Sequence, residues 1–172
     1  EISCSLVGSE MCIRDRTVER SDTISLAALT EEVFCDLDPV ADKHQIRLIQ
    51  TEGDCTVTGS YILLYRAVYN LVENAIKYNR PSGSVTVSIH SAESAVLEVT
   101  DTGIGISPEN QEKIFDPFYR VDKSRSRAMG GAGLGLALVS EIARQHNGQV
   151  KVTQSSEKGS TIALILPEST DY

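Results

Sequence analysis

The stretch NLVENAIKYN at residues 70–79 combines an apolar core pattern with polar side chains that a buried helix does not need. Asn70, Asn74 and Lys77 follow at i, i+4 and i+7, so a helix would bring them to one side. Asn is a poor helix former, because its amide competes for backbone hydrogen bonds. Its carbonyl oxygen is a neutral ligand suited to Mg²⁺. These residues indicate either a cation and phosphate site or only the solvated face of a helix.

A glycine-bearing turn follows in DTGIGISPE at residues 101–109, where a strand pattern ends in Asp101. Gly103 and Gly105 would bend the chain and let a ligand lie against the backbone. A carboxylate at a strand end can accept hydrogen bonds from the exocyclic amine of a ligand. The alternative interpretation is a helix-entry turn with a surface aspartate.

A second glycine cluster lies in GGAGLGLALV at residues 130–139, at the start of a predicted helix. Gly131, Gly133 and Gly135 alternate there, and helix N-termini present unpaired N–H groups that suit phosphate. The stretch is not a Walker A loop, because G-K-[ST] is missing, and its spacing differs from the Rossmann G-x-G-x-x-G. The alternative interpretation is a flexible hinge.

The segment FDPFYRVDKSRSRAM at residues 115–129 precedes this cluster and is basic, although the whole chain carries a net charge of -8. Beside a candidate phosphate site, clustered cations indicate phosphate binding, whereas by themselves they indicate only a solvated loop. A third glycine turn, EKGSTIAL at 157–164, reads mainly as a hairpin. The cations are Arg120, Lys123, Arg125 and Arg127.

The composition sets limits on the class of protein. A chain of 172 residues with 41% apolar and 23% charged residues can form one globular domain. The negative net charge argues against a general nucleic-acid binder, and no apolar run approaches the roughly 20 residues of a membrane span. The cysteines show no C-x-x-C pairing, which predicts a reducing cytoplasm without zinc or disulfides; they are Cys4, Cys12, Cys35 and Cys55.

Hydrophobic periodicity predicts a mixed α/β (α+β) two-layer sandwich, with helices on one face of a mostly antiparallel sheet. A loop of about 17 residues suggests a lid or binding loop. The expected elements are strand 22–27, helix 28–43, strands 46–50 and 55–59, helix 60–78, strands 84–90 and 95–101, a short helix capped by Ser107, loop 116–132, helix 134–148 stopped by Gly148, and a closing hairpin from 149–156 and 160–167.

Residues 1–16 show neither a helical nor a strand period, and they contain no apolar core of a signal peptide. The run SLVGSEMCIRDR resembles translated adapter sequence found at the ends of many unrelated metagenomic translations. We expect residues 1–16 to be a non-native or disordered head, and residues 17–172 to form the domain.

Five blocks stand in a fixed order: the Asn-bearing helix, DTGIGI, FDPFYR, GAGLGLALV and GST. Each block alone is weak, but together they resemble the N, G1, F, G2 and G3 boxes of the ATP-binding catalytic domain of sensor histidine kinases, over roughly residues 22–168. The resemblance implies the Bergerat ATP-binding fold, shared with DNA gyrase and mismatch-repair ATPases. It implies ATP and Mg²⁺ as cofactors, and a protein histidine kinase activity that this fragment alone does not complete.

The resemblance also assigns roles to single residues. Asn74 would hold Mg²⁺, Asn70 would support the phosphates, and Asp101 would recognise the adenine amine with Thr161 nearby. Phe115 and Phe118 would anchor the base of the lid. The remaining ATP-binding residues by this resemblance are Lys77, Tyr78, Gly103, Gly105, Tyr119, Arg120 with a γ-phosphate contact, Gly131, Gly133, Leu134 and Gly135.

Two positions bear on the subclass. Ala132 stands where the family often has Thr, which removes a hydroxyl but keeps the small size. Asn70 stands where gyrase-type ATPases carry a Glu that activates water, and an amide cannot act as that base. ATP hydrolysis is therefore disfavoured relative to phosphoryl transfer to another protein group.

The chain lacks a phosphoacceptor motif of the H-E-x-x-x-P type, and we expect His44, His90 and His146 to be structural or exposed. The implied partners are a helical dimerisation and phosphoacceptor domain upstream of residue 17 and a response regulator receiver domain, without nucleic acid. The implied full-length protein is a homodimer anchored at the inner membrane, with this domain on the cytoplasmic side. Two alternatives stay open: a nucleotide-gated interaction module, and a protein serine kinase of the anti-sigma type, which FDPFYRVDKSRSR disfavours.

Overall fold

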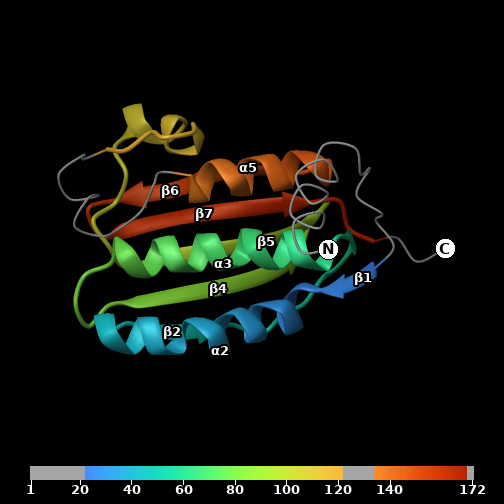
Figure 1. Cartoon of the computed structure of the whole chain (residues 1–172), viewed down its shortest axis with the longest axis horizontal. Coiled ribbons are helices and arrows are strands. Elements are labelled where there is room, and N and C mark those ends of the chain that lie inside the picture. The colour runs from blue at the N-terminus through green and yellow to red at the C-terminus, as the bar shows by residue number, and fades with distance from the viewer. Residues whose placement is uncertain (1–21, 122–133, 170–172) are drawn as a thin grey trace, which may run out of the picture.

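The computed structural model describes residues 22–121 and 134–169. Its helices lie together over one face of a sheet, and α3 runs between α2 and α5 (Figure 1). The predictions for the head at residues 1–16, for Gly131, Ala132 and Gly133, and for the cations Lys123, Arg125 and Arg127 fall outside the described ranges.

The elements follow the order predicted from the sequence, with small shifts at their ends. They are β1 (Asp22–Ser25), α2 (Leu26–His44), β2 (Arg47–Gln50), β3 (Thr56–Gly59), α3 (Tyr61–Lys77), β4 (Ser84–Ser91), β5 (Ala95–Asp101), the 3-10 turns η1 (Pro108–Asn110) and η2 (Lys113–Phe115), α5 (Gly135–Gln145), β6 (Gln149–Ser156) and β7 (Gly159–Leu166).

The main sheet has the strand order β2-β4-β5-β7-β6. Strand β2 is parallel to β4, and the other neighbours are antiparallel. Strands β1 and β3 pair separately as an antiparallel ribbon. The prediction of a mixed, mostly antiparallel sheet with helices on one face is confirmed.

The core forms where the alternating strand pattern meets the helical stripe. Val85, Val87 and Ile89 of β4 are buried at every second position, as expected for a strand with one covered face. Leu64 and Val68 of α3 are buried one helical turn apart. Polar residues that interrupt this stripe on α3 therefore lie at the border of the core.

Helix α2 begins two residues earlier than periodicity predicts. The Ser25 hydroxyl accepts a hydrogen bond from the Ala28 N–H at 3.1 Å, which is an N-cap. Asp54 adds a second acceptor, since its Oδ1 takes the Ala27 N–H at 2.9 Å. A carboxylate distant in the sequence thus helps to set the start of the helix.

The predictions about two helix ends hold only in part. Ser107 stands at the N-cap position before Pro108 as expected, but the element is a 3-10 turn, and the Ser107 hydroxyl accepts from the Asn110 side chain at 2.7 Å rather than from a backbone N–H. Helix α5 ends at Gln145, and the left-handed residue after it is Asn147, with φ 56°, rather than Gly148. Gly148 is needed for packing instead, because a Cβ there would lie 2.2 Å from the Ile165 carbonyl oxygen.

Among the described helices, none is long and apolar enough to cross a membrane.

Cys35 and Cys55 are free thiols, exposed and buried respectively. Burial is the main cause that raises the pKa of the Cys55 thiol above its ordinary value.

Among the described glycines, Gly159 is the one where an added Cβ would come closest to another residue, so its replacement tests the fold. Its φ is 134°, and a Cβ would lie 1.9 Å from the Asp101 carbonyl oxygen. We expect Gly159→Ala to lower the free energy of unfolding by about 2–4 kcal/mol, because strain and a backbone clash add. Urea denaturation measures this change, with Lys158→Ala in the same exposed turn as the control. Equal midpoints for both variants would contradict the packing described.

Candidate functional site

The Asn-bearing face of α3 meets the start of α5. The Asn70 side-chain amide donates to the Arg66 carbonyl at 2.7 Å, one turn back on its own helix. The Asn70 Oδ1 lies 3.0 Å from the place that a Cβ on Gly135 would take. The structure thus brings together two motifs that are 65 residues apart in the sequence. Any larger residue than Gly at position 135 would press on the Asn70 amide.

Further along the same face, Asn74 is half-buried, and no described residue forms a hydrogen bond with its side chain. Lys77 has a partner on its own helix, since its Nζ lies 3.5 Å from Glu73 Oε1. Glu73, which the sequence reasoning did not consider, therefore competes for the Lys77 ammonium. Tyr78, the residue that ends α3, is exposed.

The N-terminus of α5 has no side-chain cap within the described residues. Leu134 occupies the N-cap position and is exposed, and its carbonyl oxygen accepts the Leu138 N–H at 2.9 Å. The N–H groups of the residues between Leu134 and Leu138 remain for another acceptor. The partial positive charge of the helix end favours an anion there. The predicted phosphate-binding character of Leu134 and Gly135 is consistent with this geometry.

Asp101 ends β5, close to the C-terminal end of α3. Its Oδ1 accepts two backbone hydrogen bonds, from the Gly103 N–H at 2.8 Å and the Ser160 N–H at 3.3 Å. Burial raises the pKa of this carboxyl, although the two N–H donors act in the opposite direction. No described residue donates to Oδ2. A half-buried acceptor of this kind suits a ligand amine.

The two glycines after Asp101 allow close backbone packing. A Cβ on Gly103 would lie 2.3 Å from the Tyr78 carbonyl oxygen, so the turn presses against the end of α3. Gly105 has φ 77°, and a Cβ there would lie 2.0 Å from the Ser156 carbonyl oxygen. Both residues thus hold the turn against neighbouring elements. Their direct part in shaping a base pocket stays a prediction.

Polar residues that the sequence reasoning missed hold this turn in place. Thr102 Oγ1 donates to Asn79 Oδ1 and accepts the Ser84 N–H, each at 2.9 Å. Ser155 Oγ accepts the Ile106 N–H at 2.7 Å and lies 3.0 Å from the Ser160 hydroxyl. Thr102 and Ser160 each stand directly beside a glycine, which was their signal in the sequence, whereas Ser155 lies four residues before Gly159 and gave none.

The Thr161 side chain forms its described hydrogen bond with Thr100 and not with Asp101. Its hydroxyl lies 2.9 Å from the Thr100 hydroxyl, and the register pairs these two residues directly. The contact with Asp101 comes from the neighbouring Ser160 N–H. The assignment of Thr161 to adenine recognition therefore stays a prediction without a direct link to the carboxylate.

The segment before the undescribed residues is only partly anchored. Phe115 packs against the core, whereas Phe118 is 72% exposed with φ 64°. The expected anchoring role of Phe118 is wrong in this structure, because the turn at Asp116–Tyr119 leaves its ring outside. The Tyr119 hydroxyl donates to Asn110 Oδ1. Arg120 is half-buried.

The donor set fits a hard cation shared with phosphate oxygens better than a cation held by the protein alone. Within residues 22–121 and 134–169 no group of three or more His, Cys, Asp or Glu side chains is arranged to hold a metal ion. The Asn74 amide, half-buried on the face that meets α5, supplies one neutral oxygen. Mg²⁺ typically keeps several waters and takes few protein ligands beside substrate phosphates, so the residues present fit that ion.

Comparison with known proteins agrees with this geometry. Residues 59–170 match the family described as "Histidine kinase-, DNA gyrase B-, and HSP90-like ATPase". The chain is 49% identical over 147 residues to the sensor-like histidine kinase SenX3 of Mycobacterium tuberculosis, covering 84% of this chain and 36% of that protein. It is 44% identical over 140 residues to the sensor histidine kinase RppB of Synechocystis, covering 81% and 30%. The chain thus spans well under half of these relatives.

Among solved structures, the mycobacterial sensor histidine kinase MprB superposes with a TM-score of 0.73 at 28% identity, covering 87% of this chain and 99% of that one. Full-length ShkA in complex with AMPPNP shares the fold, with a TM-score of 0.77 at 24% identity over 91% of this chain and 33% of that one. This chain belongs to the histidine kinase-, DNA gyrase B- and HSP90-like ATPases, and it is an ATP-binding catalytic domain of the sensor histidine kinase type.

Proposed function

We propose that this domain binds ATP with Mg²⁺ between α3 and α5 and presents the γ-phosphoryl group to a histidine on a separate helical domain. The observation that carries the proposal is the approach of Asn70 to Gly135, which sets the amide face of α3 against the N-terminus of α5, where no side chain of the described residues forms a cap. Asp101, half-buried at the end of β5, provides the acceptor for the adenine amine.

Each group has a distinct part in this proposal. Asp101 orients the base through its free oxygen, while the N–H groups of the first turn of α5 orient the phosphates. Asn74 holds Mg²⁺, with Asn70 beside it; the bound ion neutralises charge on the phosphate oxygens. Phosphoryl transfer depends mainly on such positioning and charge stabilisation. Arg120 and Lys77 add positive charge at the rim.

Simple hydrolysis is disfavoured by the state of Asn70. Its amide nitrogen already donates to the Arg66 carbonyl oxygen at 2.7 Å, which fixes the orientation of the side chain. An amide has no lone-pair base that accepts a proton from water at neutral pH. The γ-phosphoryl group is therefore transferred to a nucleophile from outside this domain, which in this proposal is the acceptor histidine.

The proposal extends to the whole protein of which this domain would be a part. We infer that a dimerisation and phosphoacceptor domain brings the histidine, that a response regulator receiver domain takes the phosphoryl group onward, and that the domain works on the cytoplasmic side of the inner membrane in a homodimer. The described histidines do not compete for the acceptor role: His44 and His90 are exposed outside the site, and His146 is buried.

A transfer assay tests the proposed activity. The chain is mixed with the helical dimerisation domain of a sensor kinase and labelled ATP with Mg²⁺, and phosphohistidine on the helical domain is measured. We expect label that depends on the acceptor histidine of that domain and that disappears with Asp101→Asn in this chain. Nucleotide binding without any phosphohistidine, across several helical domains, would instead favour a nucleotide-gated interaction module; label on serine would favour the anti-sigma type.

A further inference from the structure

His146 is a buried polar residue at the end of α5, far from the nucleotide groups. It is 4% exposed, and its ring connects two helices. Nδ1 lies 2.8 Å from the Ile142 carbonyl oxygen on its own helix, and Nε2 accepts the Ser60 N–H, at the start of α3, at 3.1 Å. Because a carbonyl only accepts and an N–H only donates, the ring is neutral with its proton on Nδ1.

Helices α3 and α5 run antiparallel, and both ends of α5 contact α3 or its N-cap. At its start Gly135 faces Asn70 in the middle of α3; just after its end His146 meets Ser60, the residue before α3. The two contacts are separated by about 16 Å along α5, at 1.5 Å per residue. A shift of α5 along α3 at the His146 end would therefore move the N–H groups at Gly135 relative to the amides of α3.

We propose that His146 is a positioning residue for the phosphate site: its bond to the Ser60 N–H fixes the register of α5 on α3. This inference rests on the proposed nucleotide binding and adds a residue outside the site to it. The adenine end of the site does not depend on this bond, because Asp101 is held by Gly103 and Ser160 of the sheet and its turn.

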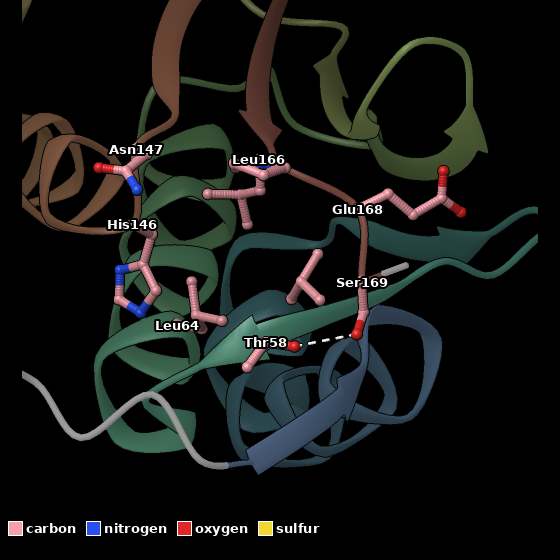
Figure 2. A pocket seen from close by; sticks show the side chains of 9 residues that line it. Thr58, Leu64, His146, Asn147, Leu166, Glu168 and Ser169 are labelled. Atoms are coloured by element: carbon pink, nitrogen blue, oxygen red, sulfur yellow. Dashed lines mark hydrogen bonds between the residues drawn. The ribbon is translucent and has the colours of Figure 1, made fainter. Parts of the chain in front are cut away.

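The surroundings of the ring support a role for its hydrogen bonds rather than for tight packing. One side of His146 borders a cavity of about 280 Å³, with Leu64, Leu166 and Glu168 among its lining residues (Figure 2). Close to the same ring, a Cβ on Gly59 would lie 2.5 Å from His146 Cδ2 and 2.7 Å from Nε2. Because position 59 carries no side chain, the His146 ring has the space that it needs to form its hydrogen bond with Ser60.

Two substitutions separate the two hydrogen bonds of the ring described above. His146→Gln places a polar group near the Nε2 position and keeps the link to the Ser60 N–H, whereas His146→Asn keeps the bond within α5 and loses that link. We expect His146→Asn to weaken binding of a non-hydrolysable ATP analogue with Mg²⁺ about fivefold to tenfold, as expected for the loss of one buried hydrogen bond. His146→Gln should retain affinity within about twofold of the unmodified chain.

The readout is calorimetric affinity for two ligands: the Mg²⁺–ATP analogue and adenosine. Only the first requires the phosphate site, so His146→Asn should leave adenosine binding unchanged. An equal loss for both ligands would assign His146 to general stability and overturn the proposal, as would equal analogue affinity in both variants. If the unmodified chain fails to bind the analogue at all, the proposed function fails instead, so the two failures are distinguishable.

Gly59→Ala gives an independent test with His146 intact. The added methyl group would displace the ring from the Ser60 N–H, so we expect the same selective loss of analogue affinity. The double variant Gly59→Ala/His146→Asn should lose no more than either single variant, because both remove the same bond. Additive losses would show that the two residues act separately and would overturn the proposed link.

Discussion

We expect replacement of Asp101 by Asn to lower the affinity for ATP and ADP by about 100-fold or more in an isothermal titration. The shape of the side chain is kept, and the Asn oxygen can still accept the Gly103 and Ser160 N–H groups that now bond to Oδ1. The nitrogen then takes the place of Oδ2, where a donor would face the donor of the adenine amine. The loss combines a charge-assisted hydrogen bond worth about 1.5–3 kcal/mol with the cost of an unsatisfied buried donor.

Asp38→Asn is the control, because it removes a charge of the same sign from an exposed position on α2. It should leave the affinity unchanged, which separates the local effect from that of net charge. Urea midpoints of both variants should stay close to that of the unmodified chain, since burial already disfavours the charged form of Asp101. Unchanged nucleotide affinity in a folded Asp101→Asn protein would defeat the assignment of the base site.

Replacement of Asn74 by Ala should remove the dependence of nucleotide binding on Mg²⁺. For the unmodified chain, we expect affinity for a non-hydrolysable ATP analogue to fall about tenfold to 100-fold when EDTA removes the ion. For Asn74→Ala, affinity should be low and equal with and without Mg²⁺. Asn74 is half-buried, and its side chain has no hydrogen-bond partner among the described residues. Its carbonyl oxygen is therefore available to coordinate the ion.

Asn74→Asp provides the matched control, because it keeps an oxygen at the same position on α3. The Mg²⁺ dependence should persist in this variant, with a changed affinity for the ion. If Asn74→Ala retains the full Mg²⁺ effect while both variants remain folded, the amide does not ligate the ion, and a different group must do so.

Local patterns were sufficient to predict most elements of the fold. The stripe of apolar residues in α3 and the alternation in β4 both follow from a periodic chain packed on one core. The order of the glycine turns and the Asn stripe also indicated the family before any contact was known. The predicted helix bounds were wrong at two ends. Asp54 extends the start of α2, and Asn147 takes the left-handed position after α5.

The relations between distant residues required the folded chain. Sequence spacing does not reveal that Asn70 faces Gly135, that Ser160 rather than Thr161 contacts Asp101, or that His146 reaches the Ser60 N–H. These contacts depend on how far one helix slides along another and on which strand register forms, and both are set by the sum of many side-chain contacts. Residue types and their order therefore identify the chemistry available to this protein, whereas long-range packing sets which donor meets which acceptor.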